Sequence, residues 1–173
     1  YLGVDVGSTS TKVVLVDASS GAIRLDIYTK TAGNPVEATR RIFESLSALK
    51  DSTGFDVEIA GCGTTGSGRK LVGVIIGADL IINEISAHAK GAKTVDNSVE
   101  TIFEIGGQDS KFIRLSEGRI VDVNMNYVCA AGTGSFIEEQ ANTLNMSLDD
   151  ISTAVMGVSP LPNSDRCTVF MNQ

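Results

Sequence analysis

The sequence predicts an α/β protein made of two similar lobes. Short apolar strands separated by glycine-rich turns open the chain, and a second strand–turn–strand–turn–strand pattern begins near Thr101. A segment with apolar residues at helical spacing follows each pattern. Since the two patterns share an order of elements but not their residues, we interpret them as a topological repeat. We therefore place a first lobe at residues 1–95 and the start of a second lobe at residues 96–173.

The first lobe is expected to begin with an antiparallel meander. Its three strands are predicted at Leu2–Val6, Lys12–Asp17 and Ala22–Thr31. Asn34 and Pro35 then predict a helix start. Apolar residues follow at roughly helical spacing, at Val36, Ala38, Ile42, Leu46 and Leu49. The other predicted elements are a short strand at Asp56–Gly61, a loop at Gly63–Gly68 and a helix at Asp79–Gly91.

The second lobe is expected to repeat this order. Its strands are predicted at Val99–Ile105, Lys111–Leu115 and Arg119–Met125, with a turn at Glu117 and Gly118. A helix is predicted after Gly134, because Phe136, Ile137, Ala141 and Leu144 lie at helical spacing.

Composition excludes several classes of partner. The chain is 42% hydrophobic and 20% charged, as in ordinary globular proteins, and its net charge of −7 argues against a nucleic-acid or anionic-membrane partner. The longest apolar stretch, Leu71–Ile82, is interrupted by Gly73, Gly77 and Asp79 and is too short to span a bilayer. The chain begins inside a strand-like run, has no signal peptide and stops at a strand-like run. We therefore expect a cytoplasmic piece of a longer polypeptide.

Two glycine-rich turns carry residues suited to binding phosphate. Asp5 precedes the first turn and Glu104 precedes the second. The turn residues and the lysines beyond them are Gly7, Ser8, Thr9, Ser10, Thr11 and Lys12, and then Gly106, Gly107, Gln108, Asp109, Ser110 and Lys111. Glycine lets backbone N–H groups approach an anion, hydroxyls add donors, and a carboxylate suits Mg²⁺. One such turn alone is better explained as a plain hairpin. The pair favours a polyphosphate clamped from both sides.

A third glycine-rich segment does not meet the P-loop pattern. Gly63 and Gly68 have the right spacing, but Arg69 and Lys70 follow where Lys and Ser or Thr are required. We expect Gly61–Lys70 to be a loop that crosses between the lobes. It either lines the phosphate site or has a plain structural role.

Four motifs resemble a known family. The segment Gly3–Lys12 resembles the first phosphate motif of the superfamily of acetate kinases, sugar kinases, heat-shock chaperones and actin. The segments Phe103–Lys111, Asn126–Phe136 and Asp165–Phe170 are more specific. They resemble the activator ATPases of 2-hydroxyacyl-CoA dehydratases and benzoyl-CoA reductases (BadF/BadG/BcrA/BcrD type), over essentially the whole chain. The resemblance implies a ribonuclease H-like, two-lobe actin-type ATPase fold, with the second lobe incomplete and its adenosine-binding motif absent here.

The resemblance also implies roles for the turn residues. Mg·ATP or ADP would bind between the lobes, with Asp5 and Glu104 organising Mg²⁺ and Lys12 neutralising phosphate charge. Gln108 or Asp109 would position the attacking water, since phosphoryl transfer depends on positioning and electrostatics. The stretch before the second-lobe helix would also approach the phosphates, because a helix N-terminus favours anions. Its residues are Gly132, Thr133 and Gly134.

The three cysteines are Cys62, Cys129 and Cys167, an odd number that argues against a disulfide framework. Spacing alone is better explained by buried small hydrophobic residues. The resemblance, however, implies a 4Fe-4S cluster that bridges a homodimer with two cysteines from each subunit, at the positions of Cys129 and Cys167. Cys62 matches no ligand position and is expected to be structural. His88, the single histidine, is expected at the surface or capping a helix.

The implied activity is ATP hydrolysis that drives a low-potential electron into a 2-hydroxyacyl-CoA dehydratase or a related reductase. The electron donor would be a protein such as ferredoxin or flavodoxin. Two alternatives stay open at this stage. One is a small-molecule kinase of the same fold, of the N-acetylglucosamine type, without a cluster. The other is a nucleotide-binding regulatory module without turnover.

Overall fold

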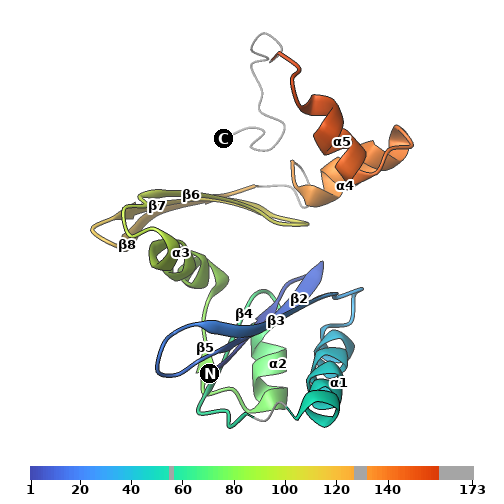
Figure 1. Ribbon diagram of the computed structural model, residues 1–173. Coiled ribbons are helices and arrows are strands. Elements are labelled where there is room, and N and C mark those ends of the chain that lie inside the picture. Colours follow the sequence, from blue (N-terminus) through green and yellow to red (C-terminus); the bar gives the residue numbers. More distant parts are fainter. Residues whose placement is uncertain (55–56, 127–131, 160–173) are drawn as a thin grey trace. The chain divides into compact units, whose positions relative to one another are not determined.

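The computed structural model describes residues 1–54, 57–126 and 132–159. The chain divides into two compact units, Tyr1–His88 and Ala89–Gln173. The division falls inside helix α3, Glu84–Val95. Figure 1 labels the helices and strands of both units. Among the described residues, no helix has the length and apolar character needed to cross a membrane.

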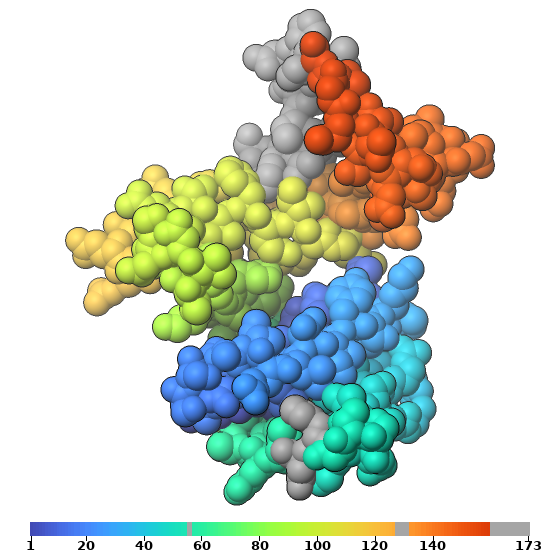
Figure 2. Space-filling view, in the orientation of Figure 1, coloured from blue at the N-terminus to red at the C-terminus, as the bar shows by residue number. Residues whose placement is uncertain are grey.

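A five-stranded mixed sheet forms the first unit, in the order β3-β2-β1-β4-β5. The strands are β1 (Leu2–Val6), β2 (Ser10–Val16), β3 (Ile23–Lys30), β4 (Cys62–Thr65) and β5 (Leu80–Ile81). The first three strands pair antiparallel, which confirms the predicted meander, whereas β1, β4 and β5 are parallel. The outer strand β3, drawn in blue, lies at the surface in Figure 2, in keeping with its alternately exposed residues.

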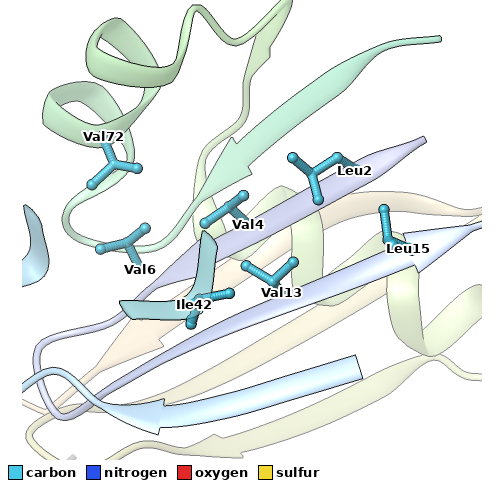
Figure 3. Packing of buried hydrophobic residues seen from close by; sticks show 7 residues of the cluster. All are labelled: Leu2, Val4, Val6, Val13, Leu15, Ile42 and Val72. Atoms are coloured by element: carbon cyan, nitrogen blue, oxygen red, sulfur yellow. The ribbon is translucent and has the colours of Figure 1, made fainter. Parts of the chain in front are cut away.

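The core of the first unit lies on one face of this sheet. Residues of β1 and β2 alternate between buried and partly exposed, so one face of the two strands is apolar. Two helices cover that face, α1 (Pro35–Thr53) and α2 (Arg69–Ile76). The buried cluster, drawn in Figure 3, consists of Leu2, Val4, Val6, Val13, Leu15, Ile42 and Val72. The turn between β1 and β2 is therefore supported by a packed core.

Helix α1 begins where its capping residues predict and ends at a glycine. The Asn34 side chain accepts a hydrogen bond from the backbone N–H of Glu37, and Pro35 follows at the first helical position. Gly54 ends the helix in the left-handed conformation, with φ of 68°, and its N–H donates to the carbonyl of Lys50. The predicted start of this helix is confirmed.

The middle of the first unit differs from the prediction. The strand predicted at 56–61 is wrong, since the described residues 57–61 form none, and Val57 and Ile59 are exposed. The strand is β4 instead, which lies between β1 and β5 and pairs with both. The helix predicted from Asp79 begins only at Glu84, because the preceding residues form β5.

A three-stranded antiparallel sheet begins the second unit, in the order β6-β7-β8. Its strands are β6 (Thr101–Ile105), β7 (Ser110–Ser116) and β8 (Arg119–Met125). Two helices follow, α4 (Gly134–Thr143) and α5 (Leu148–Val155). A capping box between Ser147 and Asp150 starts α5. The predicted strands and the helix after Gly134 are confirmed to within a few residues.

Candidate functional site

The turn between β1 and β2 is closed and braced from inside. Gly7 donates its N–H to the carbonyl of Ser10 at 2.9 Å, and a Cβ at Gly7 would lie 2.9 Å from that oxygen. A side chain at this position would clash with the turn, so glycine is required. The Thr31 hydroxyl donates to the carbonyl of Gly7 at 2.8 Å and also contacts the Thr11 hydroxyl at 2.9 Å. Thr31 could not be identified from the sequence, because only the fold brings it to this turn.

The predicted phosphate contacts of this turn lie in two environments. Ser8 and Thr9 are exposed at the tip, whereas Ser10 and Thr11 are buried. The buried hydroxyl of Thr11 is occupied by its contact with Thr31. Of the hydroxyls of this turn, those of Ser8 and Thr9 are thus the ones exposed to a ligand.

Asp5 and Lys12 form an ion pair across β1 and β2. The two residues face each other in the antiparallel register, and Lys12 Nζ lies 2.9 Å from Asp5 Oδ2. Both side chains are partly exposed, 34% for Asp5 and 41% for Lys12. The pair is therefore accessible to an incoming anion or cation, and solvent screens it substantially.

The turn between β6 and β7 has the same hydrogen bond and a more buried ion pair. Gly106 donates its N–H to the carbonyl of Asp109 at 2.8 Å. Lys111 faces Glu104 across the strands and binds both carboxylates, at 2.8 Å from Glu104 Oε2 and 3.0 Å from Asp109 Oδ1. Its side chain is only 2% exposed. Burial by itself lowers the pKa of Lys111, but the hydrogen bonds that it donates to both carboxylates outweigh burial and raise the pKa above its ordinary value.

The start of α4 closes onto this second turn. Thr133 donates its hydroxyl to the carbonyl of Gly107 at 2.9 Å. The N–H groups of Gly134 and Ser135 donate to the carbonyls of Gly106 and Gly107, each at 2.9 Å. These two hydrogen bonds hold the start of α4 against the turn. Gly132 begins this segment with φ of 64°.

A third glycine turn wraps the end of β1 within the first unit. Gly68 donates its N–H to the carbonyl of Val6 at 2.8 Å, and the Ser67 and Ser8 hydroxyls lie 3.2 Å apart. The prediction that Gly61–Lys70 crosses between lobes is wrong, since the segment lies wholly in the first unit as β4, this turn and the start of α2. The reason is that parallel pairing with β1 draws the segment into the sheet.

The remaining candidate residues are the three cysteines and the histidine, and two of them lie outside the described residues. Cys129 and Cys167 lie outside the described residues. Cys62 is a free, partly buried cysteine on β4, and burial, followed by the charge of Asp79, raises its pKa. His88 is partly buried inside α3, with Nδ1 shielded from solvent, so it does not cap that helix. Across residues 1–54, 57–126 and 132–159, no group of three or more His, Cys, Asp or Glu residues could hold a metal.

Sheet topology and the two braced glycine turns define an actin-type ATPase fold of the ribonuclease H-like class. The chain belongs to the BadF/BadG/BcrA/BcrD ATPase family, whose model matches residues 2–173. It is 36% identical over 173 residues to the activator of lactoyl-CoA dehydratase from Anaerotignum propionicum, covering 98% of this chain and 63% of that protein. This chain thus spans less than two thirds of the relative's length.

Two solved structures have the same fold at moderate identity. Component A of the (R)-2-hydroxyglutaryl-CoA dehydratase from Acidaminococcus fermentans is 33% identical, with a TM-score of 0.77, over 98% of this chain and 63% of that one. The activator of the 2-hydroxyisocaproyl-CoA dehydratase from Clostridium difficile, with bound ADPNP, is 31% identical, with a TM-score of 0.78, over 98% and 61%.

Proposed function

We propose that the protein containing this chain is an ATP-hydrolysing activator of a 2-hydroxyacyl-CoA dehydratase or of a related CoA-ester reductase. The observation that carries the proposal is the repeated carboxylate–lysine pair beside a glycine turn, Asp5 with Lys12 and Glu104 with Lys111, in a chain of an ATPase family. Support comes from the similar activator that was solved with an ATP analogue. We further propose that the ATPase lobes correspond to residues 1–95 and 96–173.

The two turns carry the kinds of group that bind phosphate and Mg²⁺, namely backbone N–H, lysine and carboxylate. Glycine at positions 7 and 106 lets each turn close tightly, since a Cβ there would lie 2.9 Å from the Ser10 carbonyl or from Asp109 Oδ1. Lys12 would contact phosphate oxygens, and Asp5 would be a carboxylate ligand for Mg²⁺, directly or through water. Gln108 or Asp109 would orient the attacking water, and Glu104 would be a second carboxylate for the ion. These are positioning and electrostatic roles.

An iron–sulfur cluster is the second part of the proposal. Cys129 and Cys167 are the residues that would hold a 4Fe-4S cluster across a homodimer, and two thiolates from each subunit meet its usual requirement for four ligands. When bound, such a cluster would supply one-electron transfer at low potential. A donor such as ferredoxin or flavodoxin fits this role, and the cytoplasm would keep the thiols reduced.

Anaerobic iron and sulfide analysis of the protein containing this chain tests the cluster. We expect about four irons per dimer, lost in both Cys129→Ser and Cys167→Ser, with ATP turnover in the wild type. Cys62→Ser is the matched control and should retain iron. A wild type that stays free of iron after anaerobic reconstitution but hydrolyses ATP would contradict the electron-transfer role.

A further inference from the structure

A cavity of about 270 Å³ lies against the sheet of the first unit. Its lining includes Asp5 from β1, Lys12 from β2, Thr65 from β4 and Ala87 from α3. Asp5 is one of the partly exposed residues of β1, whereas the core cluster contains the buried residues that alternate with them. The cavity is therefore on the face of the sheet opposite to α1 and α2.

Thr65 has a buried hydroxyl beside this cavity. Its Oγ1 is shielded from solvent and has no hydrogen-bond partner in the part of the chain that the structure describes. Leaving a buried hydroxyl unpaired is costly, so native proteins normally satisfy such a group with protein, water or ligand. The neighbouring Thr64, by contrast, donates its hydroxyl to the carbonyl of Arg69 at 3.0 Å.

The hydroxyl of Thr65 and the carboxylate of Asp5 share one region of the sheet. The parallel register of β1 and β4 pairs Asp5 with Thr65, so their side chains lie on the same face of adjacent strands. Lys12 binds Oδ2 of Asp5. The other oxygen, Oδ1, is close to Gly66, where an ideal Cβ would lie 2.6 Å from it. The carboxylate therefore has one oxygen toward Lys12 and the other toward the β4 end.

We propose that Thr65 is a positioning residue of the phosphate site, whose hydroxyl holds one water molecule together with Oδ1 of Asp5. A threonine hydroxyl can either donate to such a water or accept from it. The inference rests on the proposed function, because the water belongs to the hydration shell that Mg²⁺ keeps when a carboxylate binds it. Glycine at position 66 keeps this corner of the site open.

The test measures Mn²⁺ binding in the presence of ADP, with electron paramagnetic resonance of free Mn²⁺, in the protein that contains this chain. We expect Thr65→Val to weaken Mn²⁺ binding about tenfold, the effect of one lost hydrogen bond. Thr65→Ser should restore the affinity because it keeps the hydroxyl. Thr39→Val is the matched control: its buried hydroxyl binds the carbonyl of Pro35 in α1, and its removal should leave Mn²⁺ affinity unchanged.

Each outcome bears on a different claim. Wild-type affinity in a folded Thr65→Val variant would overturn the role of Thr65 while leaving the nucleotide site intact. If that variant does not fold, judged by its thermal unfolding, Thr65→Ala is measured by the same criterion. A wild type without ADP-dependent Mn²⁺ binding would overturn the proposed function and this inference together.

Discussion

The two glycine hairpins match each other in backbone and differ in how their lysines are held. Gly7 and Gly106 make the same turn hydrogen bond, and the strand register shifts at matching places, between Leu15 and Val16 and between Arg114 and Leu115. A threonine ahead of the next helix donates to a turn carbonyl in both. The shared topology therefore extends to individual hydrogen bonds.

The difference lies in the charges beside the turns. Lys12 is 41% exposed and pairs with Asp5, whereas Lys111 is 2% exposed and binds Glu104 and Asp109. A screened pair can exchange partners at little cost, but a buried cation surrounded by carboxylates cannot. We infer that Lys12 is the lysine that responds to a ligand, while Lys111 fixes the shape of its turn.

The largest expected difference between the two hairpins is the loss of stability when each lysine is replaced. Lys111→Met leaves two carboxylates without their buried partner and should lower the free energy of unfolding by about 3 kcal/mol. Lys12→Met should cost less than about 1 kcal/mol. Urea unfolding of both variants measures the two values. Equal losses would contradict the assignment of a structural role to Lys111 alone.

Substituting the turn glycines tests what the hairpins share. A Cβ at Gly7 would lie 2.9 Å from the Ser10 carbonyl, and one at Gly106 would lie 2.9 Å from Asp109 Oδ1. Each change to alanine should therefore cost about 2 kcal/mol of unfolding free energy. Gly91→Ala is the control: it lies in α3 with open space around it and should stabilise the protein by about 0.5 kcal/mol. Thermal unfolding compares the three, and a neutral Gly7→Ala would argue against the tight turn.

A smaller expected effect is the contribution of Lys111, in the second hairpin, to the pH dependence of stability. Because the pKa of Lys111 is raised on folding, its contribution is fully present below the unfolded pKa of about 10.4 and is lost as pH rises through the folded value. Unfolding free energies measured from neutral pH to pH 11 should thus fall more steeply in the wild type than in Lys111→Met. Parallel curves would show that Lys111 does not gain this stabilisation.

Elements with strong local patterns could be predicted from the sequence, and those set by neighbours could not. Alternation gave the strands of both meanders, and Asn34 with Pro35 gave the start of α1. The strand was predicted at the wrong residues because the apolar alternation of Val57 and Ile59 is stronger than that of β4. The position of β4 is set by its pairing with β1. Helix α2 was not predicted from the sequence, and the lack of a Cβ at Gly73 serves its close packing, since one would lie 2.8 Å from Thr64 Oγ1.

The candidate site was predictable in its residue types and less so in their environments. Asp5, Glu104 and the turn glycines were identified because carboxylates beside glycine turns are uncommon in pairs. The burial of Lys111, the brace from Thr31 and the unpaired hydroxyl of Thr65 depend on contacts between distant segments. No local pattern encodes those contacts.

The most direct test of the phosphate-binding role is calorimetric titration of Mg·ADP into the protein containing this chain. Wild type, Lys12→Met and Asp5→Asn are compared under one buffer. We expect the wild type to bind and each variant to lose about tenfold or more in affinity while unfolding near the wild-type temperature. A wild type that binds no ADP, or folded variants that bind as tightly as wild type, would contradict phosphate binding at the first hairpin.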